Sequence, residues 1–185
     1  MPYKSQPVPA GERILERYDA TALVGLAVVI RNGAIERIDA DGERTIELPH
    51  MKQLLAAAAV ARCLMPIRLR GREMKAIRRI MGLTMAEMAK RLGERTATET
   101  VARWESDKQA LGGYAEKVLR LVVCSALAKK APGIRYDAAM LADLVIADPW
   151  IAEPAFTVSA LKFEMVRLKE VSGAIVDAWD TKLAA

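Results

Sequence analysis

A chain of 185 residues is long enough for two small domains, and its content of 52% hydrophobic and 28% charged residues excludes wholesale disorder. No run of about 18 apolar residues exists that could cross a membrane. The net charge of +5 lies in one segment: between Arg68 and Lys108, eleven Lys and Arg stand against six Asp and Glu, and the remainder balances at 17 against 17. Such an excess is typical of a polyanion-binding surface or of a solvated basic face.

The first 20 residues predict a loose arm, because three prolines and early charges stand where a signal peptide needs an apolar block. We therefore expect a cytoplasmic protein. A continuous apolar run, Leu23–Ile30, predicts a strand, and the pairs Asn32-Gly33 and Asp41-Gly42 predict two hairpin turns of a small antiparallel meander. Residues 43–48 alternate in polarity and complete it. The Ala- and Leu-rich residues 50–65 predict a helix that Pro66 ends.

Residues 71–106 predict three successive short helices. Apolar residues spaced along one side of residues 72–81 predict the first helix, which Gly82 ends. Thr84 and Glu87 form a T-x-x-E capping box that begins the second helix, which stops at Gly93. After a polar turn, Val101 and Trp104 are spaced to face inward together from the third helix.

This pattern, "REMKAIRRIMGLTMAEMAKRLG…TVARWES", resembles the Cro/lambda-repressor-type, or XRE, helix-turn-helix family. The resemblance implies that the helix around residues 98–106 lies in the major groove of DNA, that Arg78 and Glu105 form a buried ion pair, and that Arg103 contacts a base. The planar guanidinium can bond O6 and N7 of guanine together. The candidate DNA-binding residues are Thr96, Thr98, Glu99, Thr100, Arg103, Lys108 and Gln109.

Each of these assignments has a structural alternative. Glu99 could accept from cytosine, or it could cap the helix and stabilise its dipole. Arg103 could be a solvated cation. Trp104 could stack on a base, although its spacing from Val101 favours core packing.

An apolar stripe on residues 115–127 is wider than a three-helix core needs, which predicts a homodimer formed through Val118, Leu119, Val122 and Val123. Alternatively, the stripe packs against the C-terminal extension. In that extension, residues 136–146 predict a helix and residues 156–168 a strand, followed by a short segment around Trp179.

Nothing in the sequence indicates an enzyme, a cofactor or a metal site. The lone histidine, His50, fits a capping or surface role, and no phosphate-binding, zinc-protease or serine-hydrolase motif occurs. Cys63 and Cys124 lack CxxC partners, so we expect two buried thiols rather than a disulfide or a zinc site.

The predicted fold class is α+β, with an N-terminal arm (1–20), a sheet-plus-helix module (21–66), an all-α helix-turn-helix domain (67–130) and a mixed extension (131–185). This architecture also resembles YgiT/MqsA-type antitoxins, without their zinc cysteines. Two functions therefore compete. One is a sequence-specific DNA-binding regulator, expected to be a repressor. The other is an antitoxin or antiactivator that acts mainly on a protein partner and binds DNA for autoregulation.

Overall fold

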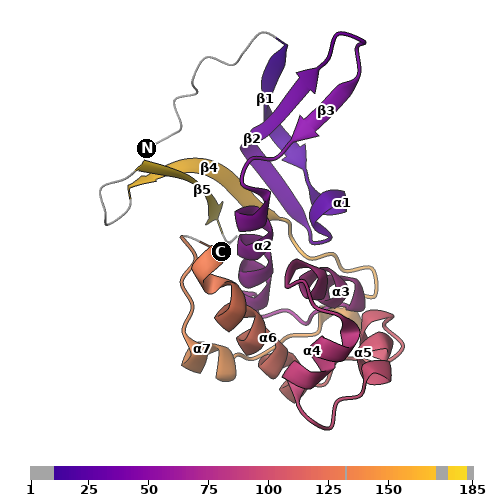
Figure 1. The fold of residues 1–185 in the computed structure, drawn as a ribbon. Helices are drawn as coiled ribbons and strands as arrows, with labels where there is room; N and C mark the ends of the chain where they lie inside the picture. The colour runs from indigo at the N-terminus through magenta and orange to yellow at the C-terminus, as the bar shows by residue number, and fades with distance from the viewer. Residues whose placement is uncertain (1–10, 132, 170–174, 183–185) are drawn as a thin grey trace.

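A mixed five-stranded sheet unites both ends of the chain in the computed structural model, which describes residues 11–131, 133–169 and 175–182 (Figure 1). The strand order is β1-β2-β4-β5, with β3 also paired to β2; β2 and β4 run parallel and the other pairs antiparallel. The strands are β1 (Glu12–Asp19), β2 (Val28–Ile38), β3 (Arg44–Glu47), β4 (Leu161–Lys169) and β5 (Ile175–Lys182).

The sheet corrects two predictions about the ends of the chain. The loose arm is wrong for residues 12–19, which pair with β2 on both sides of a bulge at Glu16; residues 1–10 lie outside the described part. The C-terminal strand predicted over 156–168 begins only at Leu161, but it joins the N-terminal strands instead of forming a separate extension. The α+β class is confirmed, and its sheet is built from three of the predicted regions: the arm, the sheet-plus-helix module and the extension.

The apolar run predicted as one strand is broken by a helical turn, α1 (Thr21–Val24). Gly25 follows with φ of 77°, a left-handed conformation that glycine adopts without steric cost. A Cβ added at Gly25 would lie 2.8 Å from the Cβ of Ala76, so this turn lies directly against α3 (Gly71–Ile80). The chain re-enters the sheet only at Val28.

Asn32-Gly33 is not the predicted hairpin turn, because β2 continues through it. Leu15 pairs with Ala34 and Arg17 with Arg31, so Asn32 and Gly33 together lie opposite a single residue of β1, which is a β-bulge. Trp179 packs directly over this bulge: a Cβ at Gly33 would lie 2.7 Å from its ring.

The second predicted hairpin turn is confirmed. Asp41 and Gly42 lie in the loop between β2 and β3, where the Asp39 amide donates to the Glu43 carbonyl at 3.1 Å and Gly42 has φ of 80°. The predicted alternation on β3 is also present, since Thr45 and Glu47 are exposed whereas Leu48 is buried.

The helical part lies below the sheet, and α2 runs from one to the other (Figure 1). The small buried side chains of α2 lie between β4, β5 and α6, which explains why the sequence there is rich in alanine. The helices are α2 (Met51–Leu64), α3 (Gly71–Ile80), α4 (Met85–Leu92), α5 (Thr98–Glu105), α6 (Gly113–Leu127) and α7 (Ala138–Ala142), with short 3-10 turns η1 (Ala128–Lys130) and η2 (Pro149–Ile151).

Two buried arginines fix the segment that leads from α2 into α3. Arg120 donates to the carbonyl oxygens of Cys63, Met65 and Ile67 at 2.6–2.7 Å. Arg62 donates to the Ile67 and Arg68 carbonyls at 2.9 and 2.7 Å. Their charges are balanced by Glu116 and Glu73, at 2.7 and 2.6 Å. The segment is therefore held by buried, charge-assisted hydrogen bonds rather than acting as a free linker.

Both cysteines are buried free thiols, as predicted: Cys63 is on α2 and Cys124 on the neighbouring α6. Among the described helices, none is long and apolar enough to span a membrane.

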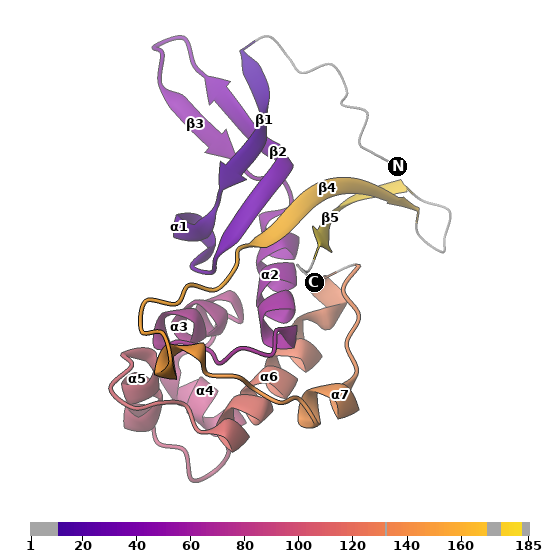
Figure 2. The same ribbon diagram turned by 180° about the vertical axis from the view of Figure 1, so that it is seen from behind.

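The helix predicted over 136–146 is wrong in length, since α7 covers only Ala138–Ala142 after a cap by the Asp137 side chain. The following residues, 143–160, cross the helical part as a strap that contains η2 (Figure 2). Ala147 forms a parallel bridge with Ile67, and its amide donates to the Pro66 carbonyl at 2.9 Å. The backbone groups of Ala147, directly after the predicted helix, thus pair with the segment before α3 instead.

Candidate nucleic-acid interface

Helices α3, α4 and α5 pack around a shared apolar centre. Met74 and Ile77 of α3, Met88 of α4, and Val101 of α5 are all buried. Trp104 joins them with only 7% of its surface exposed. The prediction that Trp104 packs in the core rather than stacking on a base is confirmed. Val101 and Trp104, one turn apart, mark the inward side of α5.

The predicted ion pair between Arg78 and Glu105 is present. Nε and Nη2 of Arg78 donate to the two carboxylate oxygens of Glu105 at 2.5 and 2.9 Å, and Nη1 donates to the Leu83 carbonyl at 2.8 Å. The hydrogen bonds to Glu105 raise the pKa of Arg78 above its usual value. The pair joins the last turn of α3 to the last turn of α5, and its Leu83 bond fixes the connection to α4.

A capping box precedes α4 and Gly93 follows it, before the turn that leads into α5. The predicted capping box is present, with the Glu87 amide donating to the Thr84 hydroxyl at 3.2 Å and the Thr84 amide donating to the Glu87 carboxylate at 2.7 Å. Gly93 ends α4 with φ of 128°, and α5 begins at Thr98 without a side-chain cap. The first backbone amides of α5 therefore have no side-chain acceptor within the described chain and are available to an external one.

The outward side of α5 carries the predicted contact residues. Arg103 is exposed opposite the Val101–Trp104 side, and it forms no ion pair or side-chain hydrogen bond among the described residues. The loop after α5 folds back on the helix, because the Lys108 and Gln109 amides donate to the Arg103 carbonyl at 3.0 and 3.3 Å. The predicted residues that are exposed are Thr98, Glu99, Arg103, Lys108 and Gln109; Thr96 and Thr100 are half-buried.

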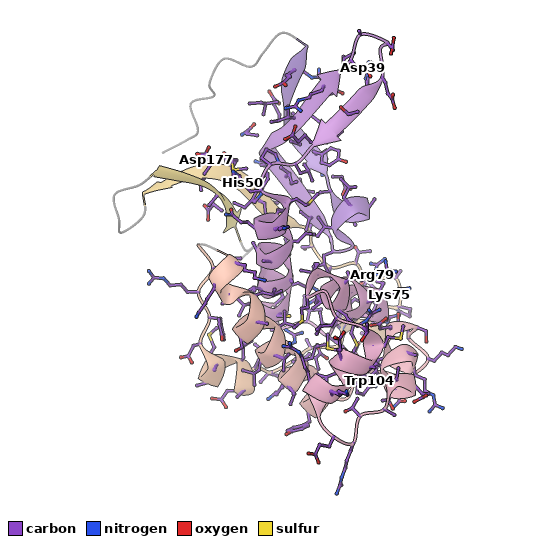
Figure 3. All side chains as sticks on the ribbon, viewed as in Figure 1. Asp39, His50, Lys75, Arg79, Trp104 and Asp177 are labelled. Atoms are coloured by element: carbon purple, nitrogen blue, oxygen red, sulfur yellow. The ribbon has the colours of Figure 1, made fainter. Side chains whose placement is uncertain are left out.

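The excess of positive charge divides into a structural part and an available part. Arg68, Arg70 and Arg78 are paired with Asp148, Asp107 and Glu105. Eight other basic side chains of this segment are exposed and form no ion pair among the described residues: Arg72, Lys75, Arg79, Lys90, Arg91, Arg95, Arg103 and Lys108. Figure 3 shows two of them, Lys75 and Arg79, on the outer side of α3. The exposed acids of the same three-helix segment are Glu87, Glu94, Glu99 and Asp107, so its free surface remains positive.

The predicted dimerisation residues on α6 are only partly accessible. Leu119 and Val123 have 0% exposure, because the same side of α6 packs on α2 within the chain. As dimer contacts these two are wrong. Val118 and Val122 are half-buried on the neighbouring side. Helix α7 of the C-terminal extension packs against α6, where the Lys117 ammonium donates to the Ala142 carbonyl at 2.6 Å. Part of the apolar stripe is therefore covered within the chain, in agreement with the alternative that it packs against the extension.

A cluster that the sequence did not reveal lies beside the end of α5. The Arg70 guanidinium is 3.5 Å from Asp107 and 5.2 Å from the ring centroid of Trp150 in the strap. Asp107 has φ of 54° and accepts from the Gly71 amide at 2.8 Å. Trp150 could not be assigned to this place from sequence, because Arg70 and Asp107 lie more than 40 positions away from it.

No group of three or more His, Cys, Asp or Glu side chains within the described ranges could hold a metal ion. His50 is exposed and starts α2 in a left-handed conformation, with no side-chain cap. Comparison with protein families, curated proteins and solved structures finds no match for this chain.

Proposed function

We propose that this chain is a sequence-specific DNA-binding transcription regulator, a cytoplasmic repressor, that places α5 in the major groove. The observation that carries the proposal is the combination on α5 of a fully packed inner side and an exposed Arg103 with no partner within the described chain. A helix anchored by Trp104 and by the Arg78–Glu105 pair presents its outer side at a fixed angle. This arrangement supports a helix-turn-helix mode of binding, in which the second helix of the pair enters the groove.

The chemistry of the outer side fits base reading. Arg103 supplies two parallel donors for guanine, a contact that contributes about 1–3 kcal/mol of discrimination. Thr98 and Thr100, at the start of α5, offer hydroxyls for phosphate and methyl groups for thymine. The uncapped amides at the same end of the helix favour a phosphate oxygen. Thr96, Glu99 and Gln109 flank these groups within the preceding turn, the helix and the following loop.

The other exposed cations would supply affinity without sequence preference. Each Lys or Arg that neutralises a phosphate releases condensed counterions, so binding should weaken steeply as salt rises. Lys108 lies in the loop after α5, a position from which its ammonium group would contact a phosphate of the DNA backbone. We propose a homodimer on DNA, since two-fold operators present the same groove face about 34 Å apart. Its contact surface excludes Leu119 and Val123.

A set of salt titrations on a selected DNA site and on random DNA tests the assignment. Arg103→Ala should lose about 1–3 kcal/mol on the selected site and much less on random DNA, which collapses the specificity ratio. Lys108→Ala should instead weaken both DNAs about equally and reduce the salt slope by about one unit. Arg79→Ala, an exposed cation on α3, serves as the matched control and should leave the specificity ratio unchanged.

Trp104→Ala separates folding from reading. Truncating this core side chain should lower the free energy of unfolding by about 3–5 kcal/mol. DNA binding and the cooperative unfolding transition should then both be lost. An Arg103→Ala protein that keeps the parent's specificity ratio would remove α5 as the reading helix.

A second candidate function, binding of a toxin or other regulatory protein, is supported by the C-terminal segment. Residues 136–160 contain four acids and no Lys or Arg. Met140, Val145 and Ile151 are exposed there, at 55%, 84% and 83%. An acidic surface with exposed apolar side chains would be repelled by DNA and suits a basic protein. Copurification with the product of the adjacent gene, lost in Val145→Asp and kept in Arg103→Ala, is the expected result for this function.

A further inference from the structure

Exposed apolar side chains gather on one C-terminal segment of this chain. Among the residues that the structure describes, six large apolar side chains are exposed, and three of them lie between positions 140 and 151. They are Met140 on α7 and Val145 and Ile151 on the strap, at 55%, 84% and 83% exposure. The exposed acids Asp143 and Glu153 lie two positions from Val145 and Ile151, and neither forms an ion pair within the described chain. These five side chains are called the C-terminal patch below.

The backbone that carries the patch is fixed at several points. The Ala142 carbonyl accepts from α6 at 2.6 Å, and the Ala147 amide donates to the segment before α3 at 2.9 Å. Val145 lies between these two anchors. Ile151 directly follows Trp150, whose indole donates to a carbonyl of the same strap at 2.8 Å. A partner would therefore bind a surface that is already ordered, which lowers the entropic cost of association.

A surface of opposite charge with its own apolar centre lies at the turn between α3 and α4. Its apolar side chains are half-buried, packed against the core on one side and accessible on the other. The cations beside them are exposed and form no ion pair within the described chain, and the exposed acid of α4, Glu87, is held by the capping box. Methionine side chains adapt their shape to a partner. This turn patch consists of Arg79, Ile80, Met81, Leu83, Met85, Lys90 and Arg91.

The two patches face away from each other within one chain. Figures 1 and 2 show α4 on one side of the helical part and the strap on the other. Because the strap is anchored, its acids and apolar side chains can meet a turn patch only on a second copy. We propose that the C-terminal patch of one copy docks on the turn patch of the next, with Val145 and Ile151 against the half-buried apolar side chains and the two carboxylates beside the cations.

Such a contact is head-to-tail, since it joins two different surfaces. It leaves one patch free at each end of the assembly, so further copies can be added. It therefore differs from the two-fold dimer proposed on DNA, in which both copies use the same surface. The two contacts are separable by variants that remove one patch at a time.

The head-to-tail contact competes with DNA. In the proposed mode of binding, α4 crosses the DNA backbone while α5 enters the groove. A docked copy would cover Lys90 and Arg91 with carboxylates in place of phosphates. This competition rests on the proposed function, whereas the association of two copies does not.

Mixing two variants without DNA tests the contact. Val145→Asp disrupts the C-terminal patch, and the double variant Arg79→Glu, Lys90→Glu disrupts the turn patch, in each case at exposed side chains. A fluorescently labelled Val145→Asp chain should bind the unlabelled double variant at least about tenfold more tightly than it binds unlabelled Val145→Asp, because only the mixture keeps one intact pair of patches. A two-fold dimer would contribute equally to both measurements. Added salt should weaken the mixed pair, since charges of opposite sign lie across the contact.

The control is Leu23→Asp, which places the same charge on an exposed apolar residue of α1. Added to the double variant, Leu23→Asp should leave its binding to Val145→Asp unchanged. Equal affinities for the mixture and for Val145→Asp alone overturn the proposal and assign the C-terminal patch to another occupant. Loss of binding through Leu23→Asp also overturns it, because the association would then be unspecific. Random duplex DNA should separate the mixed pair; a pair that forms but survives saturating DNA keeps the head-to-tail contact and overturns its competition with DNA.

Discussion

The ion pair between Arg78 and Glu105 offers the sharpest test of how α5 is held in place. The Arg78 side chain is 10% exposed and that of Glu105 is 3% exposed, so solvent screens the pair little. Arg78→Ala would leave the Glu105 carboxylate buried without its counter-charge, a loss on the order of 3–5 kcal/mol. The Leu83 carbonyl would lose its donor as well, although water entering the space left by Arg78 would recover part of that bond.

Guanidinium chloride unfolding, followed by circular dichroism, measures the free energy of unfolding of each variant. A loss of this size is a large fraction of the roughly 5–15 kcal/mol that stabilises a typical domain. Arg72→Ala, on the exposed side of the same helix, should remain within about 0.5 kcal/mol of the parent. This control separates the loss of the pair from the loss of an arginine.

A second substitution identifies the cause of the loss. Glu105→Gln in the Arg78→Ala background removes the uncompensated charge, so the double variant should be more stable than the single one. If Arg78→Ala unfolds within about 0.5 kcal/mol of the parent, or if the double variant is the less stable, the buried pair does not fix α5 as argued.

Three further outcomes follow from the fold. Gly33→Ala should lower the free energy of unfolding by about 1–3 kcal/mol, because its methyl group would meet the ring of Trp179 at 2.7 Å, whereas Gly112→Ala, with open space around it, should change stability little in the same melts. The Thr84 amide and hydroxyl lower the pKa of Glu87, so the carboxylate's stabilising contribution is present above its unfolded pKa and is lost as pH falls through the lowered value. NMR titration should show this pKa returning toward its usual value in Thr84→Ala, and an unchanged pKa would contradict the capping box. Sedimentation should give a dimer at micromolar concentration, and a species of 20.3 kDa both free and on DNA would exclude it.

The three-helix part could be predicted from sequence because its determinants are local. The positions of Val101 and Trp104 within one turn, the capping box at Thr84 and the stop at Gly93 each act within a few residues. Their agreement fixed the number and order of the helices. The Arg78–Glu105 pair spans only 27 positions, and its prediction came from the family resemblance rather than from the chemistry of the two residues.

The sheet could not be predicted in the same way, because its pairing depends on residues distant in sequence. Val28 lies beside Leu161 in a parallel pair, and the Trp179 indole donates to the Pro49 carbonyl at 2.9 Å across 130 positions. Asn32-Gly33 has the composition of a hairpin turn, and its local preference for a left-handed residue is fulfilled, since Asn32 has φ of 49°. What the composition alone cannot show is that β1 lies opposite and turns this preference into a bulge.

The contacts of the strap beside the end of α5 have the same long-range origin. From the sequence, Arg68 and Arg70 are two more cations of the basic segment, for which the expected partner is phosphate. The strap removes them from that role, because Asp148 pairs with Arg68 and Trp150 covers Arg70. Arg103, exposed and without a partner among the described residues, therefore differs from Arg68 and Arg70, which the strap and Asp107 hold within the chain.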